Sequence, residues 1–380
     1  MRILISPDKF KGSLTAPEVA DGMAAALRVR YPDAELICKP VADGGEGTAE
    51  VLTTATNGTL RTVQVHDPLF RPVEATYGIS GDGQTAFVEM AQASGLHLVP
   101  PKQRNPLAAS TYGTGQLIHD AIRQGVSEVV LCVGGSATTD AGIGMAAALG
   151  YEFLDHQNNP LPPIGKSMSQ VTRIRRTVLI PDLGRVRFRV ACDVDNPLFG
   201  PNGAAYVYGP QKGATPRLVK ELDKGLRTID GVLKYDFGIE EADMPGAGAA
   251  GGLGYGARVF LKATFGRGFD LVAQTLNLED EIRRADLVIT GEGSLDEQTL
   301  QGKVIAGIAR LAKVHQTPVA AFCGRLLLNP DQIRQLGLID ALPITPTGMA
   351  LEEAIEQAPF LLRETVAAWA VGLPGRLDKN

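Results

Sequence analysis

The sequence predicts an α/β protein with two lobes, and three observations point to this class. Short apolar runs typical of buried strands alternate with helical patterns near both chain ends. Residues 60–90 are rich in β-formers separated by short turns, which predicts a mixed sheet. A chain of 380 residues is longer than one typical domain. We therefore expect a doubly wound, Rossmann-like parallel sheet built from both chain ends (1–60 and 286–380), and a mixed-sheet α/β domain inserted between them (61–285).

The N-terminal segment predicts the first strands and helices of the parallel sheet. Residues 2–6 are predicted to form a buried strand, and a helix should begin after Thr15 because Glu18 can complete a capping box with it. That helix should end before Pro32. A strand at 35–39, a Gly-rich loop at 43–47 and a helix to about residue 56 follow.

The remaining elements are predicted from periodicity and turn residues. Residues 155–185 are polar and Pro-rich, so we expect a surface excursion there. The chain returns to the strand–loop–helix rhythm after residue 285 and closes with an amphipathic helix. The predicted strands are 62–65, 73–79, 85–90, 129–133, 187–192, 286–290 and 318–322, and the predicted helices are 113–124, 141–149 and 351–371.

Composition excludes several functional classes. Hydrophobic residues at 44% and charged residues at 21% are ordinary for a globular enzyme. The net charge of −5 and the lack of a basic run argue against nucleic-acid binding. No apolar run approaches the length of a membrane span, and the N-terminus does not read as a signal peptide. Four scattered cysteines in apolar segments predict buried, reduced thiols and a cytoplasmic location.

The most informative segment is Gly134-Gly135-Ser136-Ala137-Thr138-Thr139-Asp140, between a predicted strand and a predicted helix. Glycines let a backbone approach a ligand closely, and the N–H groups of a helix N-terminus favour anions. Three hydroxyls and a carboxylate exceed what a tight turn requires. We therefore expect a phosphate-bearing ligand here, with a simple βα turn as the alternative.

A second Gly-rich segment, residues 245–254, contains a formal G-x-G-x-x-G. No strand precedes it, so a dinucleotide fingerprint is disfavoured. A loop that opens a helix over nucleotide phosphates is preferred, with close helix packing as the alternative. Gly302-Lys303 is not a Walker A sequence, because Val304 stands where Ser or Thr is needed. Lys303 is either a point charge that meets phosphate or an exposed helix lysine.

Carboxylates follow strands, or lie in the loops after them, at Asp8, Asp43, Asp193 and Asp296. Ligands of parallel α/β sheets bind at the C-terminal strand edge. Phosphoryl transfer uses carboxylates there to hold Mg²⁺ and to orient the attacking hydroxyl. Each of these aspartates could instead cap a turn or a helix. The five histidines show no metal-ligand spacing, and no G-x-S-x-G sequence is present.

Together these segments resemble the bacterial glycerate kinases of the glycerate 2-kinase type. The similarity covers nearly the whole chain in order. The segments that carry it are Pro7-Asp8-x-Phe10-Lys11-Gly12-Ser13-Leu14, Val41-Ala42-Asp43-Gly44-Gly45-Glu46-Gly47-Thr48, Phe87-x-Glu89-Met90-Ala91, Gly113-Thr114-Gly115, Gly134-Gly135-Ser136-Ala137-Thr138, Asp193-Val194-x-Asn196-Pro197-Leu198, Gly209-Pro210-Gln211-Lys212-Gly213-Ala214, 245–252, and Thr290-Gly291-Glu292-Gly293-x-Leu295-Asp296.

The resemblance implies ATP- and Mg²⁺-dependent phosphorylation of D-glycerate, with 2-phosphoglycerate as the expected product. Asp193 is the first choice for the base or hydroxyl-orienting group and Asp296 for the Mg²⁺ partner, and the two could exchange roles. Lys11 would supply positive charge as a third catalytic residue. The expected substrate-binding residues are Asp8, Asp43, Glu46 and Lys212. The expected nucleotide-binding residues are Gly134, Gly135, Ser136, Gly246, Gly248, Gly251 and Lys303.

Alternatives stay open beside this interpretation. Glycerate could be phosphorylated at its 3-hydroxyl, or the protein could be a non-catalytic sensor of a phosphate ligand. A nicotinamide dehydrogenase is the third hypothesis, although its fingerprint lacks the required context. The sequence departs from the family pattern at Lys9, Thr139, Ala141 and residues 323–326. The expected partners are D-glycerate and ATP, with no nucleic acid or membrane, and a homodimer is allowed.

Overall fold

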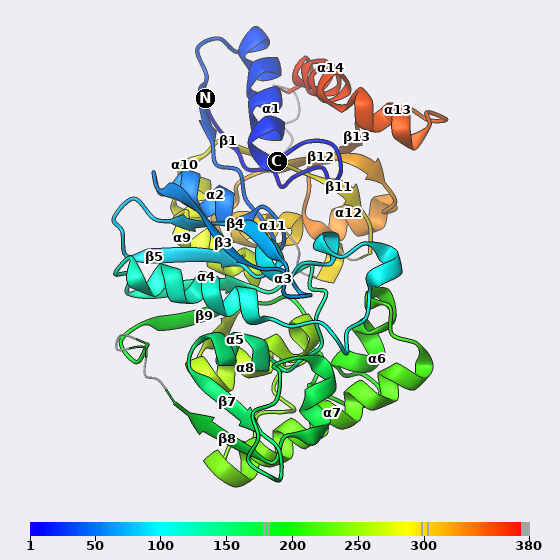
Figure 1. Ribbon diagram of the computed structural model, residues 1–380. Coiled ribbons are helices and arrows are strands. Elements are labelled where there is room, and N and C mark those ends of the chain that lie inside the picture. Colours follow the sequence, from blue (N-terminus) through cyan, green and yellow to red (C-terminus); the bar gives the residue numbers. More distant parts are fainter. Residues whose placement is uncertain (178–179, 181–182, 298, 302–303, 374–380) are drawn as a thin grey trace. The chain divides into compact units, whose positions relative to one another are not determined.

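The computed structural model describes residues 1–177, 180, 183–297, 299–301 and 304–373 (Figure 1). The chain forms two compact α/β units, Met1–Asp43 with Phe269–Asn380, and Gly44–Gly268. The α/β class with one parallel and one mixed sheet is therefore confirmed. The units divide between residues 43 and 44 and between residues 268 and 269, which is earlier in the chain than the predicted boundaries at residues 60 and 286. The difference arises because helix α2 (Thr48–Ala55) packs on strands of the second unit and helix α10 (Leu278–Arg284) packs on the first.

The first unit is a five-stranded sheet in the order β13-β12-β11-β1-β2, in which every pairing is parallel. The doubly wound sheet built from both chain ends is thus as predicted. Its strands are β1 (Arg2–Ile5), β2 (Glu35–Cys38), β11 (Leu287–Leu295), β12 (Val319–Leu326) and β13 (Asp340–Pro343). Its helices are α1 (Ala16–Arg30), α9 (Gly268–Thr275), α10, η5 (Thr299–Gln301), α11 (Val304–His315), α12 (Pro330–Leu336), α13 (Leu351–Glu356) and α14 (Ala358–Ala370).

Local sequence explains both ends of this unit. Helix α1 begins with the predicted capping box between Thr15 and Glu18. The single helix expected at 351–371 is two helices, which divide at Gln357 and leave Pro359 in the first turn of α14, where its missing N–H is tolerated. Helices α1 and α14 pack side by side (Figure 1). The ring of Trp369 meets that of Phe322 in the sheet edge-on, with 5.4 Å between the ring centroids. The two chain ends therefore share one core.

The second unit contains a six-stranded mixed sheet in the order β10-β9-β6-β5-β4-β3, with antiparallel pairs β3–β4 and β4–β5. A separate antiparallel pair joins β7 and β8. The strands are β3 (Thr59–His66), β4 (Pro72–Ile79), β5 (Thr85–Glu89), β6 (Glu128–Cys132), β7 (Tyr151–Leu154), β8 (Arg173–Arg176), β9 (Arg187–Ala191) and β10 (Thr264–Gly266). The helices are α2, α3 (Ala91–Ser94), η1 (Leu96–Leu98), η2 (Pro101–Gln103), α4 (Tyr112–Arg123), α5 (Ile143–Ala148), η3 (Gly165–Gln170), α6 (Ala204–Tyr208), η4 (Pro210–Lys212), α7 (Pro216–Phe237) and α8 (Ala249–Leu261).

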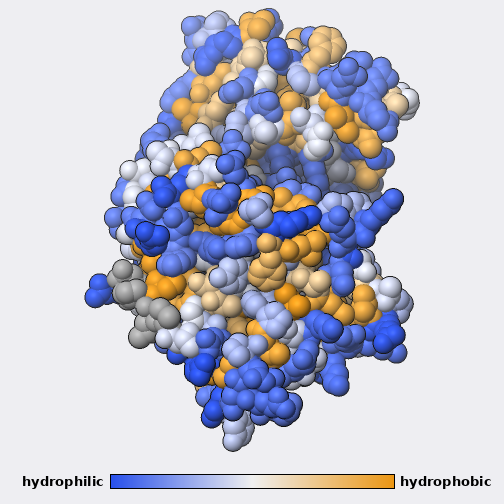
Figure 2. All heavy atoms as spheres, in the orientation of Figure 1, coloured by the Kyte–Doolittle hydropathy of each residue, from blue (hydrophilic) through white to orange (hydrophobic). Residues whose placement is uncertain are grey.

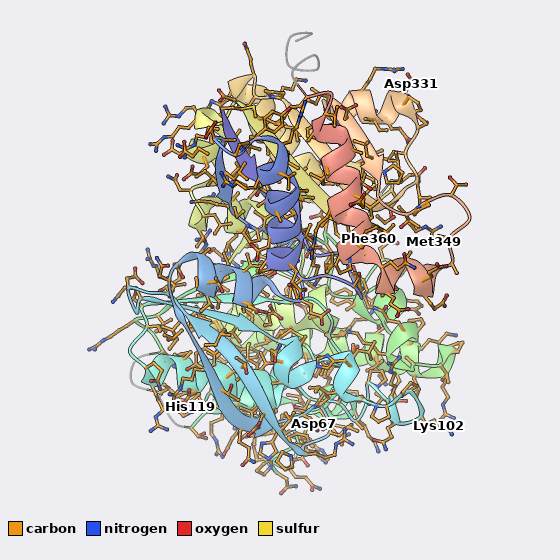
Figure 3. The ribbon with its side chains drawn as sticks, turned by 90° about the horizontal axis from the view of Figure 1, so that it is seen from above. Asp67, Lys102, His119, Asp331, Met349 and Phe360 are labelled. Atoms are coloured by element: carbon orange, nitrogen blue, oxygen red, sulfur yellow. The ribbon has the colours of Figure 1, made fainter. Side chains whose placement is uncertain are left out.

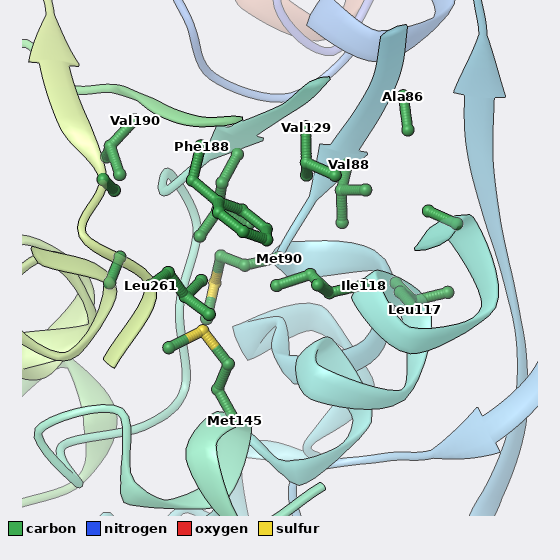
Figure 4. Close-up of a cluster of buried hydrophobic side chains, with 14 of the residues drawn as sticks. Ala86, Val88, Met90, Leu117, Ile118, Val129, Met145, Phe188, Val190 and Leu261 are labelled. Carbon is green, nitrogen blue, oxygen red and sulfur yellow. The ribbon is translucent and has the colours of Figure 1, made fainter. Parts of the chain in front are cut away.

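Apolar side chains of three parallel strands form the main core of this unit. Val88, Val129 and Phe188 come from β5, β6 and β9 and converge with Ile118 of α4 and Met145 of α5 (Figure 4). Asp67 lies in the turn between β3 and β4 (Figure 3). Its carboxylate accepts the N–H groups of Leu69 and Arg71 and so closes the hairpin. This packing leaves the C-terminal ends of β5, β6 and β9 at one edge of the sheet.

Two expectations about exposure need correction. The 155–185 segment is not only a surface excursion, because Met168, Val171 and Ile174 enter a second core beneath α7. Of the four cysteines, which are all free, Cys38 is exposed and Cys192 is half-buried. The short strand β2 borders the sheet, so Cys38 is not covered.

Polar and charged side chains cover much of the face in Figure 2, interspersed with smaller apolar groups. Among the described residues, no helix combines the length and the apolar character that crossing a membrane requires.

Candidate active site

In the second unit, candidate residues gather where β5, β6 and β9 end. These strands are neighbours and run parallel, so their C-terminal ends meet at one edge. Glu89 ends β5, Gly134 and Gly135 lie in the loop after β6, and Asp193 lies just after β9. The topology thus brings together segments that are far apart in sequence.

The Gly-rich loop at 44–47 lies against this edge. A Cβ on Gly44, at φ +86°, would lie 2.8 Å from the Cα of Gly268, and a Cβ on Gly134 would lie 3.2 Å from the Cα of Gly45. Only glycine permits such close backbone approach. Glu46, at the tip of the loop, is exposed.

The exposed part of the predicted phosphate loop is Gly134 and Gly135. Gly135 has φ +73°, and its carbonyl accepts the N–H of Leu96 at 2.8 Å. Ser136 is 8% exposed and is bridged to Gly95. Nucleotide contact at these three positions stays a prediction.

The helix N-terminus after this loop is not open to an anion, which corrects the expectation from sequence. The carboxylate of Asp140, which is fully buried, accepts the N–H groups of Gly142 at 3.0 Å and Gly144 at 3.3 Å. The backbone oxygen of Asp140 accepts the N–H of Ile143, and the Thr111 hydroxyl accepts that of Met145. The protein therefore satisfies the first turn of α5 internally.

The other polar groups of the loop are also buried. The Thr138 and Thr139 hydroxyls are inaccessible and have no hydrogen-bond partner within the described part of the chain. Burial raises the pKa of Asp140, which hydrogen bonds from Thr111 and the loop oppose. Of the three hydroxyls in the loop, those of Thr138 and Thr139 therefore face the interior.

Lys212, expected to bind substrate, is only 2% exposed. Its ammonium group donates to the carbonyl oxygen of Thr138 at 2.6 Å. Burial lowers the pKa of Lys212 to about 7, and the nearby Asp140 carboxylate partly opposes that shift. Lys212 thus contacts the loop from inside the unit.

The second Gly-rich segment is buried against other backbone. A Cβ would lie 3.0 Å from Cys192 Sγ at Gly246, 2.3 Å from the Pro197 oxygen at Gly248, and 2.0 Å from the Thr138 oxygen at Gly251. These are distances that real Cβ atoms avoid, so packing by itself accounts for the three glycines. A dinucleotide fingerprint would need a strand directly before the glycines. The residues at that place form turns and no strand, in agreement with the rejection of such a fingerprint. Nucleotide contact by these glycines remains a prediction.

Asp193 is exposed and held by the backbone. Its Oδ1 accepts the N–H of Gly268 at 2.8 Å. Two residues further, Asp195 is also exposed, and Asn196 accepts the Tyr208 hydroxyl at 2.5 Å. Asp193 therefore presents a carboxylate at the same edge as Gly134 and Glu89.

In the first unit, the candidate residues follow the adjacent strands β11, β1 and β2. Asp8 is buried beyond β1, and its N–H donates to the Gly291 oxygen at 2.8 Å. Lys11 is exposed in the loop that follows, and Asp43 is half-buried beyond β2. These positions share the C-terminal edge of the parallel sheet.

Asp296 follows β11 and belongs to a small polar cluster. Its N–H donates to Thr299 Oγ1 at 3.3 Å, and the Thr299 N–H donates to the Asp296 backbone oxygen at 3.0 Å. The Thr299 hydroxyl in turn donates to Glu292, a carboxylate only 7% exposed. The predicted Lys303 lies outside the described residues.

Sequence reasoning assigned no role to Glu89, Glu292 or Asp140. Glu89 ends the apolar strand β5, Glu292 lies within β11, and both belong to segments that carried the family resemblance. A buried carboxylate must replace its hydration with donors, so a carboxylate ending an apolar strand is a recognisable signal. Asp140 was noticed as part of the loop, but its internal partners lie at the N-terminal ends of α4 and α5, and the contact with Thr111 depends on tertiary structure.

The donor set suits one mode of Mg²⁺ binding. No group of three His, Cys, Asp or Glu side chains among the described residues could hold a metal ion. Mg²⁺ commonly keeps several waters and takes only one or two carboxylates beside the phosphates of a nucleotide. Asp193 and Asp296 each offer such a carboxylate, each in its own unit.

Comparisons with known proteins agree on one family. A model of the glycerate kinase family matches residues 3–371. A glycerate kinase of Halalkalibacterium halodurans is 45% identical over 369 residues, covering 97% of each chain. A glycerate 2-kinase of Escherichia coli is 43% identical over 358 residues, covering 94% of each chain. A crystal structure assigned to glycerate kinase 2 of Salmonella typhimurium LT2 is similar with a TM-score of 0.90 and 42% identity, covering 99% of this chain and 98% of that one.

Proposed function

Because the chain belongs to the glycerate kinase family, we propose that it transfers the γ-phosphoryl group of ATP to the 2-hydroxyl of D-glycerate. The observation that carries this proposal is the match to the family model over residues 3–371, together with 45% identity to a glycerate kinase over 97% of each chain. The 2-hydroxyl is favoured over the 3-hydroxyl by the similarity to a glycerate 2-kinase.

Asp193 is our choice for the group that orients or deprotonates the attacking hydroxyl. It is exposed at the edge where parallel strands end, and the Gly268 N–H fixes one of its oxygens at 2.8 Å. A carboxylate held in this way does not need to reorganise during the reaction. Asp296, set by Thr299, is our choice for a Mg²⁺ ligand, and Asp193 is a second.

When bound, Mg²⁺ would neutralise phosphate charge, which allows carboxylates to coexist with ATP. Lys11 is exposed and adds positive charge for the acceptor carboxylate or the transferred group. Asp8, Asp43 and Glu46 are assigned to the acceptor. The exposed backbone of Gly134 and Gly135 is assigned to the nucleotide. We place the reaction in the cytoplasm, where four cysteines without a disulfide stay reduced.

The test is ³¹P NMR of the product formed from D-glycerate, ATP and Mg²⁺. A phosphomonoester coupled to the single proton on C2 is expected. Coupling to the two protons on C3 would move the phosphate to the 3-hydroxyl and overturn the regiochemistry. ATP binding without ADP release would instead indicate the non-catalytic sensor.

A further inference from the structure

Glu89 is a buried carboxylate at the edge that carries the candidate site. It ends β5, is 4% exposed, and its Oε1 accepts the N–H of Ala49 at 2.8 Å. Removing a carboxylate from water is costly, so its burial here requires donors that replace the lost hydration. The N–H of Ala49 is one such donor.

Helix α2 has no capping side chain of its own. Its N-cap is Gly47 with φ +87°, and no side-chain hydrogen bond is made from that position. Ala49 lies in the first turn, whose N–H groups have no partner within a helix. Glu89, which lies in strand β5, therefore accepts a first-turn N–H of α2, as the side chain of an N-cap Asp or Ser usually does. Its negative charge also suits the N-terminal end of the helix dipole.

The loop at 44–47 leads directly into this helix. The backbone of this loop approaches that of Gly268 at Gly44 and that of Gly134 at Gly45. These are van der Waals contacts between carbon atoms, which do not orient the loop as a hydrogen bond would. The bond from Ala49 to Glu89 adds a directed contact three residues after the exposed Glu46. The end of β5 is thereby linked to the loop that lies across the ends of β6 and β9.

We propose that Glu89 is a positioning residue that fixes the 44–47 loop, and with it Glu46, for binding of the hydroxy-acid acceptor. The acceptor role of the loop rests on the proposed function. The fixing of the loop is argued from the Ala49–Glu89 bond, which does not depend on the proposed function. The simpler reading is that Glu89 only stabilises α2.

Glu89→Ala separates these readings when compared with Val129→Ala. Val129 is fully buried in β6 of the same sheet, so its truncation lowers the stability of the unit without touching the loop. For Glu89→Ala we expect KM for D-glycerate to rise about tenfold with a smaller change in kcat, the size of one lost charged hydrogen bond. The amides at 45–49 should exchange hydrogen about tenfold faster, because their local opening becomes easier.

Val129→Ala should lower the melting temperature while KM and exchange at 45–49 stay at the wild-type values. If Glu89→Ala behaves like Val129→Ala in all three measurements, Glu89 is only a stabiliser and the proposal is overturned. The exchange measurement needs no substrate. A wild-type protein that does not phosphorylate glycerate would therefore refute the proposed function and leave the test of Glu89 intact.

Two further variants cover loss of folding and the role of charge. Glu89→Gln keeps an oxygen that can accept from Ala49, so KM should stay within about threefold of wild type. Glu89→Asp keeps the charge but withdraws the carboxylate by one methylene, and it replaces Glu89→Ala if that variant does not fold. We expect Glu89→Asp to raise KM and speed exchange at 45–49. Wild-type values in Glu89→Asp, or a rise in Glu89→Gln as large as in Glu89→Ala, would overturn the proposal.

Discussion

The ammonium group of Lys212 donates a 2.6 Å hydrogen bond to the carbonyl oxygen of Thr138, and both residues are buried in the second unit. This bond braces the loop after β6 from the inside. Two residues later, Asp140 binds the start of the next helix. The loop is thus shaped by two buried ionisable groups, and only Gly134 and Gly135 emerge from it.

The burial of Lys212 predicts a pH-dependent stability difference between wild type and Lys212→Met. Burial lowers the pKa of Lys212 to about 7 from 10.5 in the unfolded chain. Above pH 7 the unfolded chain therefore binds the extra proton, so the stability of wild type rises with pH relative to the variant. Urea denaturation at pH 7 and pH 9 should show this difference growing by roughly 1 kcal/mol per pH unit. Parallel pH profiles would contradict the burial of a titrating lysine.

We predict that replacing the buried Asp140 carboxylate by an amide causes a large loss in the free energy of unfolding. Its carboxylate accepts from the backbone of Thr111, Gly142 and Gly144 and from the Thr111 hydroxyl. Asparagine offers one acceptor oxygen and places an amide donor among donors. Asp140→Asn should cost about 2–4 kcal/mol in the free energy of unfolding.

The matched control is Asp230→Asn, because the Asp230 carboxylate is half-buried and accepts the Tyr255 hydroxyl. It should cost about 1 kcal/mol or less. Equal losses in the two variants, measured by urea denaturation, would mean that the Asp140 cluster is not an organising centre.

The close packing around Gly251 leads us to predict that the second Gly-rich segment needs its glycines for backbone packing. At φ +71° a Cβ would lie 2.0 Å from the Thr138 oxygen, so Gly251→Ala should cost about 3 kcal/mol or more, or prevent folding. Gly231 lies in α7 with nothing within 4 Å of an added Cβ. Gly231→Ala should stabilise by about 0.5–1 kcal/mol. A Gly251→Ala protein as stable as wild type that had lost ATP affinity would favour the phosphate-loop interpretation instead.

Thr299 connects Glu292 to the proposed metal ligand Asp296 through hydrogen bonds, so we predict that its hydroxyl affects Mg²⁺ binding. Its hydroxyl donates to Glu292 and accepts the Asp296 N–H, and valine has the same shape without the hydroxyl. Thr299→Val should raise the Mg²⁺ concentration needed for half-maximal rate by about tenfold, as expected for loss of an outer partner.

Thr317→Val is the control for Thr299→Val. The Thr317 hydroxyl donates to the Ile282 oxygen, on the same unit, and belongs to no proposed site. A Mg²⁺ titration that shifts equally for both variants would reject the link.

Much of the fold was predictable because it follows local rules. The capping box of Thr15 and Glu18 and the apolar run ending at Ile5 have local causes, and the structure confirms both elements. Helix α7 was not predicted, although Thr215 caps it and Pro216 is its first residue. Its sequence is polar overall, and its buried residues form only a narrow stripe. The division at Gln357 was missed because the apolar period continues through it.

The site was predictable in part for the same reason. Residues after strands, such as Asp193 and Asp8, could be assigned to a sheet edge because parallel topology places strand ends together. Sequence could not show that Lys212 points inward or that Asp140 closes the helix N-terminus, since both depend on partners far along the chain. Glycines are ambiguous in the same way, because close packing and ligand approach require the same residue.

Asp193 predicts the largest loss of activity. Asp193→Asn keeps an oxygen that can accept the Gly268 N–H, so the local backbone should persist, but the amide cannot take a proton from the acceptor hydroxyl. The kcat of this variant should fall about 10²–10⁴-fold, the usual contribution of a proton-transfer group. Asp195→Asn, on an exposed carboxylate two residues further, should leave kcat within about threefold of wild type. A coupled ADP-release assay at saturating ATP and D-glycerate measures both. If Asp193→Asn also stays within a few-fold of wild type, another group performs the proton transfer and Asp193 serves only to hold the end of β9.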